Sequence, residues 1–475
     1  MAPSSLDLVI TTALEGRMKD LRTRQRILRD LHTKLTENVE ELVIATARDD
    51  RISREEAQVV VSAGLLELRA HYDRLDLKDE LDEEYSIARK ESRLKKRVPS
   101  GMVYVIPEAY TTFFSIITAL SAAIAAGNCV VIEMQDSLAR SPRVLRRCLQ
   151  ELQQYTDSVT TVSQRPGPEF LRHCLLVEQA VEEKVSASSE CLRVLPSIRR
   201  RTVAIVDRTA DASVAAREIV ASQLLFQSQG RYSVDQVFVN EYVLDDFYSA
   251  LTREAAEIAT RLATRVSNLK DRDSKGAVIG LQKPEFPVLQ ISDRSDSRLH
   301  QRQHQRGFII HKVTSLDDAI DTVCEGRAAG ALYLFAGYDE AKYLSQYIPS
   351  QATFVNHIPP ELQIGPAYPE GFETSVSLRY TREMFETPRP ERVDTGKVRH
   401  SITLCDHITA GKTSAIVSRA CQPLKATGQG RAGAMDFFLQ GMIFNLVTCV
   451  LPLTALSLYA TSKGIGMLYQ RFLKL

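Results

Sequence analysis

The carboxylate of Glu133 ends a stretch, AIAAGNCVVIEMQDS at residues 123–137, whose residue types suit nucleotide binding. Small residues typical of a helix run up to Gly127, and a short apolar strand follows. Sheets that bind nucleotides are often entered in this way. A carboxylate at the end of such a strand accepts hydrogen bonds from ribose hydroxyls. Glu133 is therefore a candidate binding residue, and the alternative is a solvated strand end above a vestigial cleft.

Other residues that could bind metals lack the spacing for it. His300 and His304 are four residues apart, but they lie in SDRSDSRLHQRQHQR, which is typical of a solvated loop. The eight cysteines stand singly without a CxxC pair, and the charged N-terminal sequence contains no secretory signal. We therefore expect no metal, no disulfide framework and a reduced, cytosolic location for the bulk of the chain.

A literal GxGxxG, GQGRAG, occupies residues 428–433. Phosphate binding by such a loop requires a strand before it and a βαβ unit around it, and the sequence shows neither pattern. Residues 387–431 are rich in Pro, Thr, Lys and Arg without sustained periodicity. We interpret 387–433 as a flexible linker.

The charge balance argues against nucleic acid as a partner. The chain has 475 residues, with 60 Lys and Arg against 59 Asp and Glu, and it is 44% hydrophobic. There is no basic stripe and no acidic tail. The composition is that of an ordinary globular protein with room for two or three domains, and small polar or apolar partners are expected.

The first of two long uncharged runs, residues 109–132, meets the length rule for a membrane span. Gly127 and Asn128 interrupt it as a helix stop does, and CVVI follows as a strand of the kind buried on both faces of a parallel sheet. We therefore predict a buried helix over 111–126 and a strand over 129–132.

The second run, from Phe437 to Tyr459, belongs to a stretch without charge between Asp436 and Lys463. At about 1.5 Å per residue, one helix of this length crosses a hydrocarbon core of about 30 Å. Pro452 kinks such a helix without forbidding it. The run predicts a membrane anchor, and the alternative is a helix docked on the globular part or on a partner.

The order of elements predicts an open, mostly parallel α/β sheet. Residues 5–95 have helical periodicity, and a strand-like MVYVI at 102–106, the buried helix with its strand, and a helix over 141–153 follow. A second α/β series begins with a strand over 202–206 and a long helix, and it continues to ATFVN at 352–356. Two α/β lobes and a tail result.

These segments, in this order, resemble an aldehyde dehydrogenase across about residues 10–385. VPSGMVYVIPEAYTTFFSIITALSAAIAAGNCVVIE is similar to the first nucleotide-binding unit of that family, and RTVAIVDRTADASVAAREI to the opening of its catalytic lobe. VTSLDDAIDTVCEGRAAGALYLFAGYDEAKYLSQYIPSQATFVN is similar to a late segment of that lobe. The uncharged tail resembles membrane-anchored fatty-aldehyde members, and the chain as a whole resembles fungal aldehyde-dehydrogenase-like proteins associated with secondary metabolism. The resemblance implies two Rossmann-type lobes plus a C-terminal transmembrane helix.

The resemblance also implies a catalytic set: a thiolate nucleophile, an amide that holds the oxyanion and a carboxylate base. The amide position corresponds to Ala109, whose methyl group donates no hydrogen bond. The base position corresponds to a residue near Ser197, and the nucleophile position falls at or near Ser233. None of these three residues supplies the implied chemistry directly.

Ser233 could replace the thiolate only with a general base beside it, and the surrounding sequence offers no His or Lys. No cysteine occurs between Cys191 and Cys324. A nucleophile from elsewhere, namely Cys174, Cys191 or Cys324 in the cavity between the lobes, would overturn the expectation of lost catalysis.

For the cofactor, the resemblance implies contacts at Pro107, Glu133 and Asp136. Glu133 stands where the family keeps a lysine for the ribose, and Asp136 matches the acidic ribose ligand. An ionised carboxylate accepts from a hydroxyl but repels a 2′-phosphate. We therefore expect weak binding of NAD in preference to NADP.

The parts expected are a nucleotide-binding-type lobe over 1–198, a catalytic-type lobe over 199–358, a return segment over 359–386, a linker over 387–433 and a transmembrane anchor over 434–462. The resemblance implies a homodimer and a lipophilic aldehyde as ligand. The anchor predicts an internal membrane, the endoplasmic reticulum, with the globular part in the cytosol.

Two hypotheses of function follow. In the first, the chain is a catalytically degenerate member, a pseudoenzyme or scaffold at a membrane. In the second, it is an active NAD-dependent dehydrogenase that oxidises a lipophilic aldehyde to its acid with a divergent site. The residues at the catalytic positions favour the first hypothesis.

Overall fold

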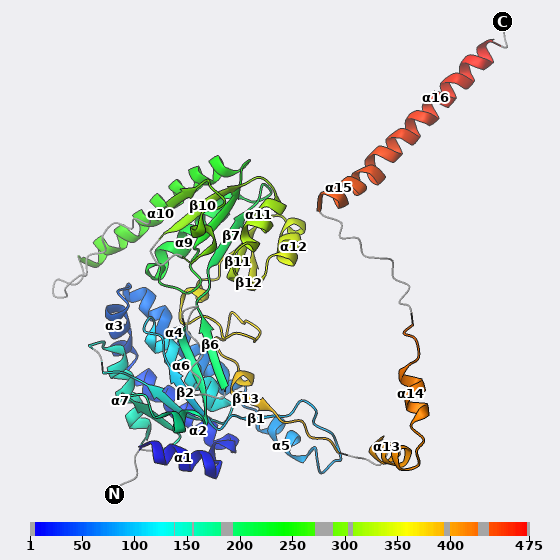
Figure 1. The fold of residues 1–475 in the computed structure, drawn as a ribbon. Helices are drawn as coiled ribbons and strands as arrows, with labels where there is room; N and C mark the ends of the chain where they lie inside the picture. The colour runs from blue at the N-terminus through cyan, green and yellow to red at the C-terminus, as the bar shows by residue number, and fades with distance from the viewer. Residues whose placement is uncertain are drawn as a thin grey trace. The chain divides into compact units, whose positions relative to one another are not determined.

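The computed structural model describes residues 5–136, 138–153, 156–181, 193–270, 288–302, 307–393, 400–425 and 437–472. The chain divides into two compact units, Met1–Asp394 and Thr395–Leu475 (Figure 1). The first unit contains two parallel sheets flanked by helices, which confirms the predicted α/β class. The GQGRAG sequence and Cys191 lie outside the described residues.

Helices precede the first sheet where the sequence predicted them: α1 (Ser5–Glu15), α2 (Leu21–Glu37), α3 (Val39–Asp49), α4 (Arg54–Asp73) and α5 (Leu77–Tyr85). Side chains that accept from free backbone N–H groups begin several of them. Asp20 caps α2, and Ser53 and Glu56 form a capping box at the start of α4. Local sequence therefore fixes where these helices start.

The first sheet has five parallel strands in the order β4–β3–β2–β5–β6. The strands are β2 (Met102–Ile106), β3 (Cys129–Glu133), β4 (Val159–Val162), β5 (Cys174–Val181) and β6 (Arg193–Ile198). Helix α6 (Thr112–Ala125) joins β2 to β3, α7 (Ser141–Gln153) joins β3 to β4, and the short α8 (Pro168–Leu171) precedes β5. Helix α6 packs against α4, and nearly all of its residues are buried, as is all of β3. This burial confirms that the first uncharged run is core.

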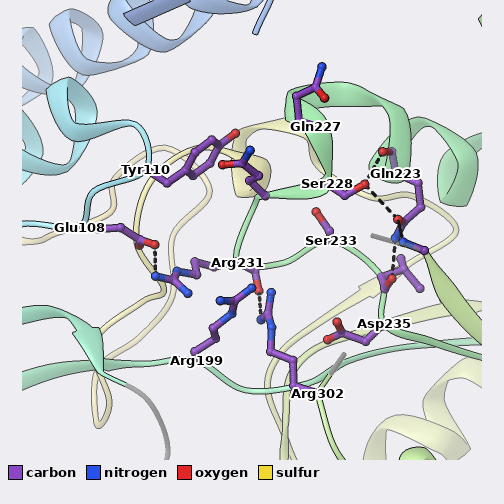
Figure 2. Close-up of a pocket in the computed structure, with 13 residues that line it drawn as sticks. Glu108, Tyr110, Arg199, Gln223, Gln227, Ser228, Arg231, Ser233, Asp235 and Arg302 are labelled. Carbon is purple, nitrogen blue, oxygen red and sulfur yellow. Dashed lines mark hydrogen bonds and ion pairs between the residues drawn. The ribbon is translucent and has the colours of Figure 1, made fainter. Parts of the chain in front are cut away.

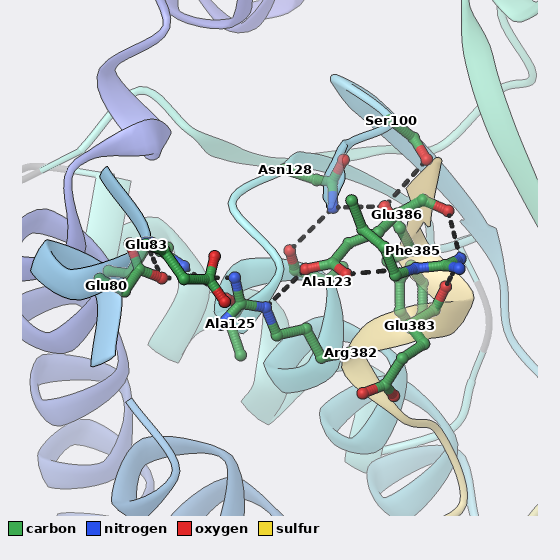
Figure 3. Close-up of polar contacts among 12 residues, drawn as sticks. Glu80, Glu83, Ser100, Ala123, Ala125, Asn128, Arg382, Glu383, Phe385 and Glu386 are labelled. Carbon is green, nitrogen blue, oxygen red and sulfur yellow. Dashed lines mark hydrogen bonds and ion pairs between the residues drawn. The ribbon is translucent and has the colours of Figure 1, made fainter. Parts of the chain in front are cut away.

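Asn128 holds three segments of this lobe together at the turn from α6 into β3 (Figure 3). Its side-chain amide donates to the carbonyl oxygens of Ala123 at 3.2 Å and Phe385 at 3.1 Å, and its carbonyl accepts from the N–H of Gly101 at 2.8 Å. Gly127, with φ of 89°, supplies the left-handed residue that ends the helix. Gly127 and Asn128 thus end α6, lie at the start of β3, and connect this turn by hydrogen bonds to Gly101 before β2 and to the distant Phe385.

The second sheet has six parallel strands in the order β12–β11–β7–β8–β10–β9. The strands are β7 (Thr202–Val206), β8 (Gln236–Asn240), β9 (Val288–Ile291), β10 (Phe308–Val313), β11 (Ala329–Phe335) and β12 (Ser350–Val355). Helices α9 (Ala212–Leu224) and α10 (Leu244–Lys270) lie on one face, and α11 (Leu316–Cys324) and α12 (Tyr338–Tyr347) lie on the other (Figure 1). Central strands buried on both faces explain their continuous apolar sequences.

The chain then returns to the first lobe, where β13 (Glu386–Pro388) pairs antiparallel with β1 (Arg97–Pro99). The buried Arg379 supports this return. Its guanidinium donates to main-chain carbonyl oxygens, including that of Ile364 at 2.8 Å, and lies 4.4 Å from the ring centroid of Tyr368. Its own N–H donates to the carboxyl of Glu67 on α4 at 3.0 Å, which ties the return segment to the N-terminal helices.

The second unit contains α13 (His400–Thr409), α14 (Ser414–Ala420) and a long C-terminal helix. The long helix consists of α15 (Phe437–Asn445), a π-helical turn (Leu446–Val450) and α16 (Leu451–Phe472). The π-helical turn contains Thr448, the residue whose carbonyl would meet the ring of Pro452 in a regular helix. Residues Leu439–Thr461 are exposed, and they are long and apolar enough to cross a membrane.

Burial of Glu67 predicts a pH-dependent stability. Burial raises the pKa of Glu67 from its ordinary 4.5 to about 8. Between these values the folded protein keeps a proton that the unfolded chain releases, so this group lowers stability as pH rises toward 8. The side chain of the Glu67→Gln variant stays neutral. We therefore expect its melting temperature, measured by calorimetry, to fall by a few degrees less between pH 5 and pH 8 than that of the wild type. Glu84→Gln, at an exposed position, should follow wild type, and a Glu67→Gln profile parallel to wild type would refute this account.

Candidate functional site

A pocket of about 210 Å³ lies where the two lobes of the first unit meet. One wall is the turn after β2, which carries Glu108 and Tyr110. The other walls come from residues that precede β7, β8 and β10, among them Arg199, Arg231 and Arg302 (Figure 2). The pocket therefore combines the carboxyl end of a strand in one sheet with the amino ends of strands in the other.

Glu108 and Arg231 form a buried ion pair across this pocket (Figure 2). Their side chains are only 4% and 12% exposed, respectively. The N–H of Glu108 donates to the amide oxygen of Gln179 at 3.1 Å, and Gln179 donates to the carbonyl oxygen of Ser115 at 2.8 Å. The second carboxylate oxygen of Glu108, Oε2, is buried and has no hydrogen-bond partner among the described residues.

Arg302 adds a second guanidinium close to Arg231. Its Nη1 donates to the carbonyl oxygens of Arg200 at 2.9 Å and Arg231 at 2.8 Å. Burial, and then the nearby charge of Arg302, lower the pKa of Arg231 to about 10, so Arg231 still carries its charge at neutral pH. Figure 2 shows Arg199 and Arg302 extending toward Arg231 from the same side. Positive charge is thus concentrated in one part of the pocket.

Backbone strain borders the pocket on both sides. Four residues without the freedom of glycine have positive φ: Thr111 (48°), Phe226 (51°), Gln227 (60°) and Ser228 (54°). Such conformations cost about 1–3 kcal/mol each and persist where neighbours enforce them. The neighbours here include Glu56, which accepts from the N–H of Phe226 at 2.7 Å, and Tyr110, whose hydroxyl donates to the carbonyl of Phe226 at 3.0 Å. The pocket wall is therefore held by contacts from the first lobe.

Ser233, the expected position of the nucleophile, lines the pocket but is committed to a structural hydrogen bond. Its hydroxyl donates to the side-chain oxygen of the buried Gln363 at 2.6 Å. Gly230 allows this arrangement, because a Cβ there would lie 2.5 Å from the same Gln363 oxygen. No base from the described residues bonds the Ser233 hydroxyl.

The other expected catalytic positions do not join Ser233 at the pocket lining. Ser197 is buried on β6, and its hydroxyl lies 3.4 Å from the hydroxyl of Tyr380. Burial raises the pKa of Tyr380 to about 12. Ala109 is exposed, and its carbonyl oxygen accepts from Thr112 at 2.6 Å, at the start of α6. The described residues thus place no carboxylate at Ser197 and no side-chain amide at Ala109.

No cysteine of the described residues lines the pocket. Cys174 is buried at the start of β5, and Cys324 ends α11, where its thiol lies 3.5 Å from the carbonyl of Tyr347. Burial raises the pKa of Cys324, and it raises the pKa of Cys129 to about 12, which suppresses the thiolate.

Glu133, the last residue of β3, is buried and already has hydrogen-bond partners. Its Oε2 accepts from the Tyr104 hydroxyl at 2.8 Å and from Arg165 at 3.2 Å, and its Oε1 accepts from Gln135 at 3.4 Å. The burial of Tyr104, followed by its bond to Glu133, raises the pKa of its hydroxyl. Both carboxylate oxygens therefore have donors from the protein itself.

Asp136 and Pro107, the other expected cofactor contacts, lie close to the same sheet edge. Asp136 is 75% exposed and forms an ion pair with Arg146 at 2.6 Å. Pro107 follows β2 and is partly exposed. With the oxygens of Glu133 engaged and Asp136 paired, these residues fit a nucleotide ribose poorly. The described residues also contain no group of three or more His, Cys, Asp or Glu placed to hold a metal ion.

The sequence analysis missed Glu108, Arg231 and Arg302 as site residues. Two signals were present. Glu108 is the last charge before the uncharged residues 109–132, and Arg231 stands in QSQGRYS beside the expected nucleophile. Their pairing joins segments far apart in the chain, which only the fold reveals.

Comparisons with known proteins bear on this site. The model of the aldehyde dehydrogenase family matches residues 12–267. A beta-apo-4'-carotenal oxygenase from Gibberella fujikuroi is 23% identical over 352 residues, which cover 67% of this chain and 65% of that protein. The chain thus matches somewhat less than two thirds of the length of this curated relative.

Solved structures show the same fold. The substrate-bound state of AldH from Staphylococcus aureus has a TM-score of 0.66 at 18% identity, covering 88% of this chain and 98% of that one. An NAD-dependent benzaldehyde dehydrogenase from Corynebacterium glutamicum has a TM-score of 0.60 at 14% identity, covering 83% and 89%. GapN from Methanocaldococcus jannaschii, a glyceraldehyde-3-phosphate dehydrogenase in complex with NADP, has a TM-score of 0.61 at 14% sequence identity. The match covers 81% of this chain and 92% of that one.

The hydrogen bond of Ser233 predicts a stability effect. Ser233→Ala leaves the buried oxygen of Gln363 without its donor, which costs about 1–3 kcal/mol. Calorimetry should therefore show a melting temperature lower by a few degrees. Ser345→Ala, at an exposed position on α12, should leave the melting temperature unchanged. Equal melting temperatures for wild type and Ser233→Ala would contradict the structural role.

Proposed function

Because the chain belongs to the aldehyde dehydrogenase family, we propose that it is a catalytically degenerate member that acts as a binding or scaffold protein at a membrane. The observation that carries the proposal is the Glu108–Arg231 ion pair in the pocket between the lobes. A guanidinium stays protonated and supplies neither a nucleophile nor a base. The pair occupies the cleft with a guanidinium and with a carboxylate that this guanidinium already engages, and it provides neither the thiolate nor the side-chain amide that aldehyde oxidation requires.

The cofactor side supports the same proposal. Relatives named above include an NAD-dependent enzyme and one in complex with NADP. In this chain Glu133 is buried and bonded by Tyr104 and Arg165, so it has little capacity left for a ribose hydroxyl. We therefore propose weak NAD binding at most, with the ribose near Glu133 and Asp136. NAD would serve as a hydride acceptor if a substrate reached it.

The pocket argues against the alternative, oxidation of a lipophilic aldehyde. Its volume of about 210 Å³ is below the range of about 300–1,000 Å³ typical of sites for drug-sized ligands. Charged and amide side chains, among them Arg199, Arg302 and Gln223, make up much of its lining. A long apolar chain would have to displace these groups from their hydrogen bonds.

We propose that Leu439–Thr461 anchors the protein in an internal membrane, with the endoplasmic reticulum as the first to test. The support is the length of this helix and its exposed apolar side chains. The seven cysteines of the described residues are free, which suits a globular part in the reducing cytosol. The fungal origin of the curated relative supports a role in fungal secondary metabolism, and family membership supports a homodimer.

Loss of catalysis predicts the outcome of a direct assay. The full chain, in mild detergent with NAD or NADP and either hexanal or hexadecanal, should form no reduced nicotinamide above a protein-free control. Removing a single catalytic group already costs about 10²–10³-fold in rate, and several are replaced here. Absorbance at 340 nm measures the outcome.

Aldehyde-dependent NADH formation would contradict the proposal. The variants Ser233→Ala, Cys174→Ser and Cys324→Ser would then identify the nucleophile, since the one that abolishes the signal carries it. An unchanged signal in all three would direct attention to Cys191, outside the described residues.

The anchor predicts resistance to extraction. The full chain should pellet with membranes and stay there in alkaline carbonate. Leu446→Lys with Leu453→Lys, near the middle of the helix, should release it, because each lysine costs about 2.5–3.5 kcal/mol at the centre of a span. Val417→Lys with Leu424→Lys, exposed outside the helix, is the matched control and should stay in the pellet. Extraction of the wild-type chain by carbonate would instead favour the docked helix.

A further inference from the structure

The arginines of the pocket between the lobes are the chemistry that the proposed function leaves unused. We propose that this pocket binds a small organic acid, a monocarboxylate that also carries a hydroxyl or amino donor. The acid's carboxylate lies against Arg302, and its donor group lies against Glu108. The inference deepens the proposed function and rests on it in one respect: the acid is bound without being formed or consumed there.

The lining of the pocket contains more arginines than carboxylates. Three arginines, Arg199, Arg231 and Arg302, face two carboxylates, Glu108 and Asp235. Glu108 is paired with Arg231, and the carboxylate of Asp235 accepts from the N–H of Thr202 at 2.8 Å. Arginines thus outnumber carboxylates in the lining, which favours a ligand that carries a carboxylate.

Arg302 is the residue placed to receive that carboxylate. Within the described structure its hydrogen bonds go to main-chain carbonyl oxygens, those of Arg200, Gly230 and Arg231, and it forms no ion pair. Its Nε is buried, and no group in the described part of the chain accepts a hydrogen bond from it. A guanidinium with an unused N–H in a pocket binds a carboxylate through a charge-assisted hydrogen bond, which is stronger than a neutral one.

Glu108 supplies the second recognition element. The residue is 3% exposed, and no described residue donates a hydrogen bond to its buried Oε2, although this atom belongs to a charged group. An unsatisfied buried acceptor of this kind costs about 1–3 kcal/mol, which a ligand donor would recover. A carboxylate without a hydroxyl or amino group, such as butyrate, cannot satisfy Oε2, because it has no hydrogen to donate. A hydroxyl or amino group on the acid can.

The same residues discriminate between anions. Phosphate carries more than one negative charge at neutral pH, and its oxygens would lie near the Glu108 carboxylate, which repels them. The volume of about 210 Å³ holds a short acid and excludes a dinucleotide. The amide and hydroxyl groups of Gln227 and Ser228 on the wall suit a polar ligand of this size.

Binding titrations test the proposal. The full chain in nonionic detergent is titrated by calorimetry with 3-hydroxybutyrate, butyrate, butyramide and inorganic phosphate. We expect 3-hydroxybutyrate to bind most tightly, butyrate about tenfold more weakly, and butyramide and phosphate more weakly still. Arg302→Gln should weaken 3-hydroxybutyrate about tenfold or more. Arg294→Gln, an arginine paired with Glu325 away from the pocket, should leave it unchanged.

Glu108→Gln is the second variant, and its expected effect has a different form. Glu108→Gln should bind butyrate as tightly as wild type or more tightly. It should also reduce the difference in affinity between butyrate and 3-hydroxybutyrate, because the carboxylate oxygen that accepts from the hydroxyl is gone. A melting curve for each variant separates loss of the fold from loss of the site.

Several results would overturn the proposal. The first is that none of the acids binds saturably. The others are an affinity for butyramide equal to that for butyrate, an affinity for phosphate higher than that for 3-hydroxybutyrate, or a folded Arg302→Gln variant that binds 3-hydroxybutyrate as tightly as wild type. Failure of the proposed function is a separate signal, because it appears as aldehyde-dependent NADH formation and not as a change in these affinities.

Discussion

The buried ion pair of Glu108 and Arg231 constrains the cleft between the two lobes. Glu108 comes from the turn after β2 and Arg231 from the segment before β8, so the pair also joins the lobes. Breaking such a pair by removing one partner costs about 3–5 kcal/mol, because the other charge is left buried. The cleft is thus held in one arrangement by two charges. That arrangement suits recognition of charged or polar ligands and not the generation of a nucleophile.

The rest of the first unit maintains this cleft from a distance. Asn128 connects the end of α6 to β2 and to Phe385, and Arg379 connects the return segment to α4 through Glu67. Closer to the cleft, Gln179 accepts from the N–H of Glu108, and Glu56 and Tyr110 bond the backbone of the strained Phe226. These supporting hydrogen bonds lie outside the expected catalytic positions, with the exception of the bond from Ser233 to Gln363.

Much of the fold could be predicted because its signals are local. The helix over Ser141–Gln153 and the strand over Thr202–Val206 follow from periodicity and burial, and Gly127 with Asn128 marks the end of α6. The site could be predicted only in part. The bond of Ser233 goes to Gln363, and that of Glu133 goes to Tyr104 and Arg165; both depend on segments brought together by the sheets. Sequence spacing carries no information about such contacts.

An experimental structure of the full chain, determined with NAD and an aldehyde present, tests the central claim most directly. We expect Arg231 to be paired with Glu108, no cysteine to carry a covalent adduct, and Glu133 to remain bonded to Tyr104 and Arg165. A thiohemiacetal or thioester on a cysteine in the cleft, with a nucleotide ordered against Glu133 and Asp136, would contradict it.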